Sequence, residues 1–179
     1  MAESRETAAE RGADTGEGVY RVVGSRVLPV PPEQAWQAWS DPEVVCQWWG
    51  PTGFSCPRAD VDFRVGGTSL VTMQEPAEYG GMQLHNGWRY TGIEEPSRIE
   101  FYLTFTDEQG RVLDPAAVGI PAGVPREVPH VVELTPLEGG HTQLTVTERG
   151  YTSREARDVS QAGLEQTLDK LQALFGDSP

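Results

Sequence analysis

The feature that most constrains the fold is an amphipathic segment near the end of the chain, residues 153–175. Its apolar side chains recur every three or four positions, a spacing that predicts one α-helix with a wide apolar stripe. The stripe consists of Val159, Ala162, Leu164, Leu168, Leu171, Leu174 and Phe175. Thr152 and Glu155 have the spacing of a capping box at the start of this helix. The helix would be roughly 35 Å long at about 1.5 Å per residue, which is long enough to cross a whole sheet.

The segments that precede this helix have the two-residue period of β-strands. Residues 98–107 show it most clearly, because apolar and polar side chains alternate throughout, and residues 95–97 form the predicted turn before them. The other predicted strands are residues 19–30, 59–67, 68–76, 85–96, 126–136 and 141–150. In the second strand along the chain, Val61, Phe63 and Val65 share one face.

Two short helices are predicted between the first and second strands. The first opens on a pair of prolines, and the second runs from the N-cap Asp41 to the stop signal Gly50. Trp48 and Trp49 therefore stand at the end of the second helix, where at least one of them must be buried. A strand, two short helices, grouped antiparallel strands and one long helix predict an α+β fold, with a sheet of six to seven strands wrapping the C-terminal helix.

Composition limits the location and the partners of the chain. Residues 1–18 contain no aromatic residue and, after the first methionine, no apolar side chain larger than alanine, so we expect a disordered tail before one domain at residues 19–176. The net charge of −13 disfavours nucleic acid and anionic membrane surfaces. No stretch is apolar enough for a signal peptide or a membrane span, so we expect a cytoplasmic protein without membrane insertion.

The two cysteines, Cys46 and Cys56, do not predict a metal site. No further cysteine and no nearby histidine completes a ligand set. In a reducing compartment we expect two reduced, partly buried thiols, with a disulfide as the alternative. The sequence thus predicts neither a metal nor another cofactor.

Two local features depart from the regular pattern around them. Residues 107–125 contain three prolines and three glycines without a sustained period, and a loop of this length is usually mobile or functional, so we expect a mobile lid. Gly163 stands in the middle of the long helix, where glycine is unfavourable by about 1 kcal/mol relative to alanine. We therefore expect the helix to pack closely against the sheet at Gly163.

Four stretches of the sequence, taken together at their spacing, resemble a known family. They are RVLPVPPEQAWQAWSDPEVVCQWWGP at residues 26–51, DFRVGG at 62–67, GWRYTGIEEPSRIEF at 87–101 and the Gly-Leu pair at 163–164. The combination resembles the family named after the activator of the Hsp90 ATPase, within the START-like, helix-grip superfamily that is also called SRPBCC. The resemblance covers about residues 19–175. It departs where the family typically has Gly-Trp and this chain has Gly163-Leu164, and where the 107–125 segment looks longer than usual.

The resemblance implies a curved antiparallel sheet that grips the long helix, with an elongated cavity between them. Members bind apolar or amphipathic small molecules there, and polyketide cyclases and aromatases among their relatives carry out chemistry in the same cavity. The residues implied for ligand binding are Trp48, Trp49, Phe63, Trp88, Tyr90, Phe101, Leu103, Phe105, His130, Leu164 and Leu168. The alternative for the aromatic residues is an ordinary core position. Of the two adjacent tryptophans, we expect one in the core and one at the cavity rim.

Three polar side chains stand an even number of positions from apolar residues of the same strand, so they are predicted to lie with them on the inner face of the sheet. They are His130 on the strand 126–136, Glu148 on the strand 141–150, and Arg26 on the first strand. Such groups could orient a ligand, or they could act as general acid and base. The alternative is that they pair structurally, Arg26 with Glu148 and His130 with a backbone carbonyl.

Three functions compete on these grounds. The first is binding of a small hydrophobic ligand in the internal cavity, and the second is a cyclase-like enzyme that uses His130, Glu148 or Arg26. The sequence contains no Gly-x-Ser-x-Gly, HExxH or phosphate-binding glycine-rich motif that would support another chemistry. The third is an Hsp90-type co-chaperone, which the resemblance supports least, because the eukaryotic activators carry a separate N-terminal domain. A homodimer is left open.

Overall fold

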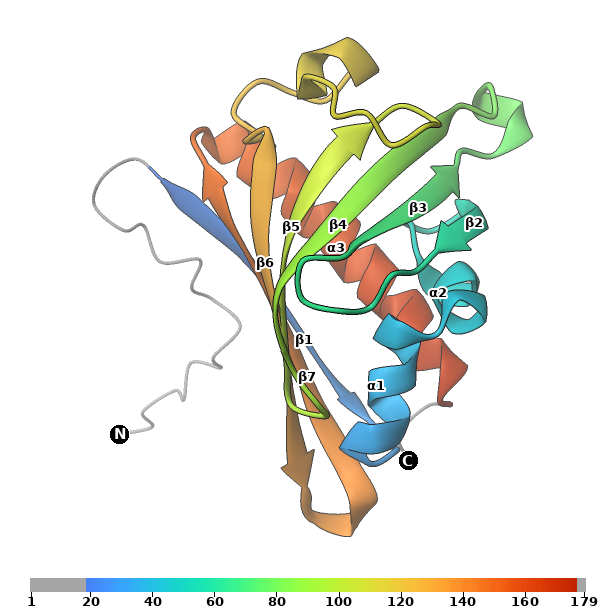
Figure 1. The fold of residues 1–179 in the computed structure, drawn as a ribbon, viewed down its shortest axis with the longest axis vertical. Helices are drawn as coiled ribbons and strands as arrows, with labels where there is room; N and C mark the ends of the chain where they lie inside the picture. Colours follow the sequence, from blue (N-terminus) through green and yellow to red (C-terminus); the bar gives the residue numbers. More distant parts are fainter. Residues whose placement is uncertain (1–18, 177–179) are drawn as a thin grey trace, which may run out of the picture.

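The computed structural model describes residues 19–176, so the tail predicted at residues 1–18 lies outside the described residues. Seven antiparallel strands form one sheet in the order β1-β7-β6-β5-β4-β3-β2. They are β1 (Tyr20–Leu28), β2 (Ser55–Asp60), β3 (Thr68–Gln74), β4 (Gln83–Glu94), β5 (Arg98–Thr106), β6 (Glu127–Leu137) and β7 (His141–Tyr151). The sheet curves around α3 (Arg154–Leu174), with α1 (Pro32–Ser40) and α2 (Pro42–Trp48) at one side (Figure 1). The predicted α+β fold is confirmed.

The long helix α3 begins and ends within one residue of the predicted segment. Its N-cap is Ser153, whose hydroxyl accepts a hydrogen bond from the Ala156 backbone N–H, so the cap predicted at Thr152 is wrong by one position. Leu168 and Leu171 are fully buried, and burial of each such side chain contributes about 1.5–3 kcal/mol to folding. In the described part of the chain, no helix has both the length and the apolar character needed to cross a membrane.

The close approach between α3 and the sheet occurs at Gly24 of β1. A Cβ atom on Gly24 would lie 2.6 Å from Leu168 Cδ1 and 3.0 Å from Leu164 Cδ2. Apart from the adjoining residues and the backbone of its own helix, a Cβ atom on Gly163 would meet no atom of residues 19–176 within 4 Å. The prediction of close packing at Gly163 is therefore wrong, because this glycine lies on a flank of α3 that faces open space rather than β1.

The short helices α1 and α2 build an aromatic core against the sheet. Asp41 caps α2 as predicted, because its side chain accepts a hydrogen bond from the Glu43 backbone N–H at 2.9 Å. Trp39 of α1 packs edge-on against Trp48 of α2, with ring centroids 4.7 Å apart. Trp48 is fully buried, and its indole Nε1 donates to the Ala38 carbonyl at 2.8 Å. The end of α2 is thus fixed by packing and by a hydrogen bond.

The strand predicted at residues 59–67 is misplaced. β2 ends at Asp60, and an irregular loop leads from it into β3. Val65 is 59% exposed, whereas Phe63 packs edge-on against Tyr90 with ring centroids 5.1 Å apart. Turn and loop hydrogen bonds satisfy part of this backbone, so a short apolar–polar alternation does not require a strand here.

The segment 107–125 lies beyond the end of the sheet, at the top of Figure 1. It contains one short 3₁₀ helix, η2 (Pro115–Val118). Its last residues are tied to the start of α3, because the Thr152 backbone N–H donates to the Gly123 carbonyl at 2.9 Å. The mobile lid expected here stays a prediction.

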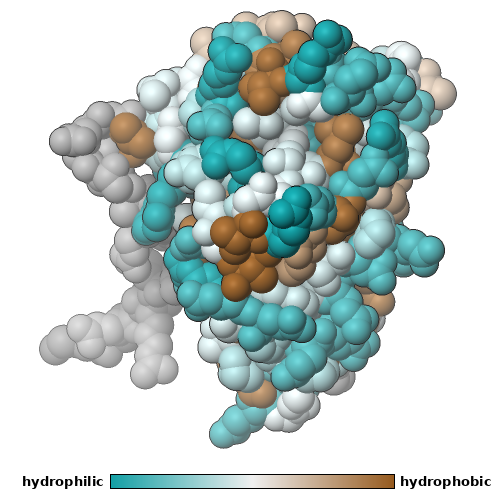
Figure 2. All heavy atoms as spheres, in the orientation of Figure 1, coloured by the Kyte–Doolittle hydropathy of each residue, from teal (hydrophilic) through white to brown (hydrophobic). Residues whose placement is uncertain are grey.

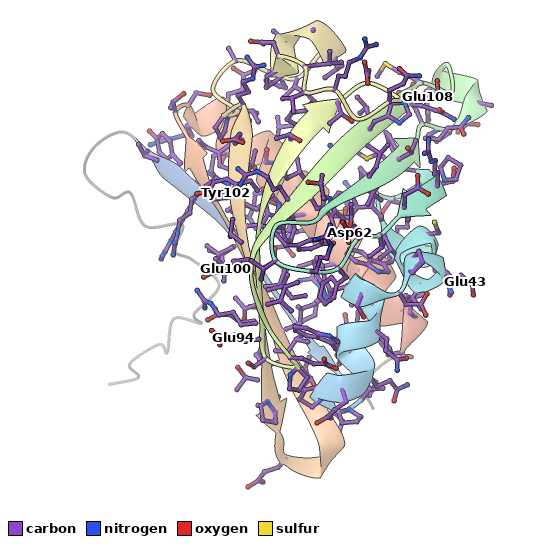
Figure 3. All side chains as sticks on the ribbon, viewed as in Figure 1. Glu43, Asp62, Glu94, Glu100, Tyr102 and Glu108 are labelled. Atoms are coloured by element: carbon purple, nitrogen blue, oxygen red, sulfur yellow. The ribbon has the colours of Figure 1, made fainter. Side chains whose placement is uncertain are left out.

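The outer face of the sheet, away from α3, is polar. Figure 2 shows hydrophilic side chains over most of one face of the molecule, with apolar side chains in separate patches. Arg98 forms ion pairs with Glu100 and Glu133, both at 2.7 Å. Glu94, Glu100 and Tyr102 lie together on the outer side of the strands in Figure 3. The apolar residues of the sheet are thus turned toward the helices.

Candidate functional site

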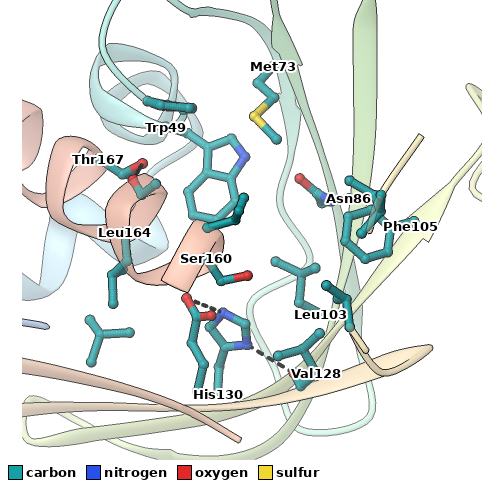
Figure 4. A pocket seen from close by; sticks show the side chains of 18 of the residues that line it. Trp49, Met73, Asn86, Leu103, Phe105, Val128, His130, Ser160, Leu164 and Thr167 are labelled. Carbon is teal, nitrogen blue, oxygen red and sulfur yellow. Dashed lines mark hydrogen bonds and ion pairs between the residues drawn. The ribbon is translucent and has the colours of Figure 1, made fainter. Parts of the chain in front are cut away.

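A cavity of about 200 Å³ lies between the inner face of the sheet and the first half of α3 (Figure 4). The lining residues are Trp39, Trp48, Trp49, Gly50, Pro51, Met73, Asn86, Leu103, Phe105, Ile120, Pro121, Val124, Val128, His130, Val146, Glu148, Tyr151, Val159, Ser160, Gly163, Leu164 and Thr167. Most of these side chains are aromatic or aliphatic. The polar groups among them are few, and most lie on the strands.

Strand alternation builds the sheet side of this cavity. Residues two apart on a strand share a face, so Leu103 and Phe105 of β5 both point inward. Val128 of β6 pairs in register with Leu103, and Val146 of β7 continues the same apolar surface. The side chains that the sequence predicts to face inward therefore do face inward on these strands.

The adjacent tryptophans at the end of α2 differ in burial. Trp48 is fully buried, whereas Trp49 is half-buried. The Trp49 ring lies 4.8 Å from that of Trp88 and 5.6 Å from that of Trp48, measured between centroids. Both indoles contribute to the cavity wall, but the Trp49 Nε1 is buried without a hydrogen-bond partner among residues 19–176.

The structure brings together only part of the predicted ligand-binding set. Six of the predicted residues line the cavity, namely Trp48, Trp49, Leu103, Phe105, His130 and Leu164. The other five lie away from its wall and pack in the core, namely Phe63, Trp88, Tyr90, Phe101 and Leu168. Phe101 stacks on both Trp88 and His130, with centroids 5.2 and 4.8 Å away. The alternation of side chains along a strand shows which face of the sheet a residue lies on, but not how close it lies to the cavity. The cavity occupies only part of the length of these strands, so some inward-facing residues do not reach it.

His130, Glu148 and Tyr151 form a polar cluster at the sheet side of the cavity. The Nε2 atom of His130 lies 3.3 Å from Glu148 Oε1, and the Tyr151 hydroxyl donates to Glu148 Oε2. The Nδ1 atom of His130 lies 2.9 Å from the Val128 carbonyl, which can only accept, so Nδ1 carries a hydrogen. The contact between Nε2 and Oε1 therefore needs one further proton, held by the imidazole or by the carboxyl group.

The surroundings of this cluster hold its members in place. Burial, followed by the charge of Glu148, raises the pKa of the Tyr151 hydroxyl above its ordinary value, because both effects disfavour the phenolate. Tyr151 therefore stays protonated and donates to Glu148. The ring of Phe101 stacks on His130 with an interplanar angle of 18°. The three polar groups are thus oriented without a ligand.

Arg26 does not belong to this cluster. It lies on the edge strand β1, and its guanidinium binds Glu165 at 2.7 Å and Asp169 at 2.8 Å, both on α3. The expected pair of Arg26 with Glu148 is wrong, because α3 crosses β1 and supplies two carboxylates there. His130 does contact a backbone carbonyl, as the structural alternative predicted.

The sequence prediction missed four polar residues of the cavity wall, namely Tyr151, Ser160, Thr167 and Asn86, and the last of these, Asn86, is the most informative. It is 1% exposed, and its Oδ1 atom has no hydrogen-bond partner in the described range 19–176. The signal was available, because Asn86 shares the inward parity of Trp88 and Tyr90 on β4. A carboxamide within an apolar face is the kind of exception that marks a site.

The remaining wall comes from the 107–125 segment and from α3. Ile120, Pro121 and Val124 of that segment line the cavity. On α3, Val159 lines it while remaining 55% exposed, which marks where the cavity reaches the surface. The segment expected to act as a lid therefore does border the cavity.

The cysteines lie outside this wall. Cys46 and Cys56 are free thiols with their Sγ atoms 3.6 Å apart. Burial and the neighbouring Cys46 raise the pKa of Cys56 to about 12. Within residues 19–176, no three histidine, cysteine, aspartate or glutamate side chains lie together so that they could hold a metal ion.

Comparisons with known proteins agree with this architecture. The sequence profile of the family described as activator of Hsp90 ATPase homolog 1-like protein matches residues 29–176. A crystal structure from Chromobacterium violaceum is similar, with 27% identity, a TM-score of 0.70, and coverage of 88% of this chain and 98% of that chain.

Two further solved structures show the same fold. A solution structure from Arthrobacter aurescens has 23% identity and a TM-score of 0.69, over 89% of this chain and 87% of that chain. The AHSA1 protein from Silicibacter pomeroyi has 22% identity and a TM-score of 0.68, over 86% of this chain and 96% of that chain. A comparison with curated proteins found no match.

Proposed function

We propose that this chain, which belongs to the activator of Hsp90 ATPase homolog 1-like family, binds an apolar or amphipathic small molecule in the cavity between its sheet and α3. The observation that carries the proposal is the cavity, about 200 Å³ of space with mainly aromatic and aliphatic walls. Binding sites for small molecules typically combine such walls with a few placed polar groups.

The volume supports a ligand of one or two rings. Protein interiors contain few voids larger than a water molecule, so a space of this size is unusual for ordinary core packing. An engineered apolar cavity of about 150 Å³ binds benzene. At about 200 Å³, this cavity has room for a somewhat larger molecule.

Native mass spectrometry of the purified protein tests the proposal directly. We expect a non-covalent adduct whose mass gives the class of the ligand. An apolar dye should bind the native protein and quench indole fluorescence, because the Trp49 ring lies in the cavity wall. A protein without an adduct that also fails to bind any apolar probe would contradict the proposal.

Two leucine substitutions on α3 provide the matched control. Gly163→Leu should fill the cavity, because Gly163 lines it and a Cβ there meets no described atom within 4 Å. Ala162→Leu adds a comparable apolar side chain at an exposed position one residue away. Loss of dye binding only in Gly163→Leu would support the cavity as the site, whereas equal binding by both variants would argue against it.

A second candidate function is proton-transfer chemistry in the same cavity. The observation that favours it is that Glu148 contacts both His130 and Tyr151, so three titratable groups converge on the cavity wall. The protonated pair could give its proton to a bound carbonyl as a general acid, and the pair without that proton could accept one from the carbon beside the carbonyl as a general base.

Glu148→Gln separates the two functions, because glutamine keeps the size of the side chain but cannot exchange the proton. Any adduct found by mass spectrometry should be incubated with each protein. Conversion by the wild type but not by Glu148→Gln, when both proteins bind the compound, would support the enzyme. Release of the unchanged compound by both proteins would support binding alone.

A further inference from the structure

We infer that the cavity selects an uncharged aromatic molecule with a hydroxyl group that binds between Trp49 and Asn86. This inference rests on the proposed function, because it specifies the class of ligand that the cavity would take. Trp49 offers an indole N–H donor and Asn86 offers a carboxamide oxygen. A hydroxyl group is the simplest partner for this pair, since it accepts from the indole and donates to the amide.

Both polar atoms are buried and unpaired within the described part of the chain. Trp49 Nε1 and Asn86 Oδ1 have no hydrogen-bond partner there, although both residues line the cavity. Buried polar groups without a partner are rare in native proteins, because each one destabilises the fold. The neighbouring Trp48 shows the ordinary solution, since its Nε1 donates to the Ala38 carbonyl. Trp49 and Asn86 face the cavity instead, where a bound molecule would pair with them.

The two residues occupy neighbouring positions in the wall. The Trp49 ring lies 4.8 Å from the Trp88 ring, and Asn86 is two residues before Trp88 on the same face of β4. Positions two apart on a strand are separated by about 7 Å. Figure 4 shows the nitrogen of Trp49 and the side chain of Asn86 pointing toward each other. One group of a bound molecule could therefore contact both.

The charges around the cavity favour an uncharged ligand. Among the residues that line it within the range 19–176, there is no lysine or arginine. His130 and Glu148 lie in contact with each other, and Glu148 also accepts from Tyr151. A ligand carboxylate would lose its hydration in an apolar space that offers no free cation to pair with it. It would also lie in the same cavity as the carboxyl group of Glu148. Ligands with a carboxylate should therefore bind poorly.

The walls between the polar groups favour a ring. Trp39, Trp48, Trp49 and Phe105 present aromatic surfaces to the cavity. Aromatic pairs gain from edge-to-face and offset contacts in addition to their buried area. Together with a volume of about 200 Å³, these surfaces fit a molecule of one or two aromatic rings.

The test compares naphthalene with two derivatives that carry a hydroxyl or a carboxylate at the same ring position. Binding to the full chain is measured by calorimetry. The hydroxyl derivative should bind about tenfold more tightly than naphthalene, the effect of one net hydrogen bond. The carboxylate derivative should bind at least about tenfold more weakly than the hydroxyl derivative.

Equal affinities for naphthalene and its hydroxyl derivative, or a preference for the carboxylate, would overturn the inference and leave the proposed function intact. Failure of all three to bind would overturn the inference, whereas the proposed function fails only if the protein carries no adduct and binds no apolar dye.

Trp49→Phe and Asn86→Leu test whether the preference for the hydroxyl derivative over naphthalene depends on Trp49 Nε1 and Asn86 Oδ1. Each variant keeps an apolar side chain of similar shape and removes one hydrogen-bonding group, so the advantage of the hydroxyl derivative should fall to about twofold or less. Trp88→Phe is the matched control, because Trp88 Nε1 is also buried and unpaired among the described residues but Trp88 lies outside the cavity wall. That variant should keep the full advantage.

Stability gives a second readout that does not depend on a ligand. Asn86→Leu should raise Tm, because leucine replaces an unpaired buried acceptor with an apolar group of similar size. If Asn86→Leu fails to fold, the result with Trp49→Phe decides the test. A hydroxyl advantage that survives unchanged in Trp49→Phe would overturn the inference.

Discussion

The two halves of α3 meet the sheet in different ways. In the packed half, around Leu168 and Leu171, the side chains are fully buried, and Gly24 of β1 lets the helix come close. In the open half, from Val159 to Gly163, the helix borders the cavity, and a Cβ on Gly163 would meet no described atom within 4 Å. One amphipathic helix therefore belongs to the core along one part of its length and forms a cavity wall along another. Which of the two it does depends on whether side chains of the sheet fill the space that faces it.

Polar contacts fasten the packed half. Arg26 of β1 joins Glu165 and Asp169 of α3, and Lys170 Nζ donates to the carbonyls of Gly50 and Phe54 at 3.1 and 2.9 Å. Partly exposed ion pairs of this kind contribute little free energy each, but they fix the position of the helix. Gln161 also joins the open half to β1, because its side chain accepts from the Val23 backbone N–H at 3.2 Å and donates to the Val23 carbonyl at 2.8 Å, so the cavity lies beside a helix that is held at both halves.

The largest difference should appear between the two adjacent tryptophans. Trp48→Ala should lower the free energy of unfolding by about 3–5 kcal/mol, because it removes a fully buried ring and its hydrogen bond to Ala38. Trp49→Ala should cost clearly less, since Trp49 is half-buried and its Nε1 has no partner among residues 19–176. Urea denaturation of both variants measures the difference. Equal losses would show that Trp49 belongs to the core as fully as Trp48.

The next effect concerns Tyr90, in the packed aromatic core. Burial raises the pKa of Tyr90 to about 12, while its hydroxyl stays hydrogen-bonded to Ser69 at 2.7 Å. An unfolded tyrosine ionises near pH 10, so between about pH 10 and 12 only the unfolded chain gains from ionisation. The stability contribution is therefore present below about pH 10 and is lost as pH rises toward 12, by up to about 3 kcal/mol.

Tyr90→Phe isolates this contribution. Cys56 and Tyr151 also have raised pKa values, so the wild type should lose stability from several groups as the solution becomes alkaline. The variant should lose up to about 3 kcal/mol less than the wild type over the same interval, measured by denaturation at each pH. Parallel curves for the two proteins would mean that Tyr90 ionises in the folded state near its ordinary pKa.

Gly24→Val tests the close approach in the packed half. The added Cβ would lie 2.6 Å from Leu168 Cδ1, so the helix or the side chain must shift, and overpacking of this kind typically costs about 1–3 kcal/mol. Ser25→Val is the matched control, because Ser25 is the next residue on β1 and is exposed. Thermal unfolding should separate the two variants. A Gly24→Val protein as stable as the control would mean that α3 can move away without loss.

The sequence was sufficient for the elements whose pattern is long and regular. The stripe of α3 and the alternation of β5 to β7 place these elements correctly, and they put His130 and Glu148 on the inner face. The pattern failed at residues 59–67, where alternation over a few residues does not distinguish a strand from a loop that buries Phe63. Short patterns carry too few side chains to specify their backbone.

The candidate site depends on information that periodicity does not contain. Alternation along β5 places Phe101 and Leu103 on the same face of the sheet, but only Leu103 lines the cavity. The cavity extends along only part of the strand. Arg26 has inward parity as well, yet it meets α3 at the edge strand rather than the cavity. Distances across the fold, such as that between Gly24 and Leu168, decide where space remains.

The smallest expected effect on stability is also the one that most sharply separates the two halves. Gly163→Leu replaces a mid-helix glycine at a position with space for a side chain, so it should raise the free energy of unfolding by about 0.5–1 kcal/mol. The gain comes from helix propensity, because the new side chain enters the cavity and meets no clash at its Cβ. The same class of change at Gly24 should destabilise, so the two glycines should give opposite signs in one denaturation experiment. A destabilised Gly163→Leu protein would mean that the open half is as closely packed as the rest of α3.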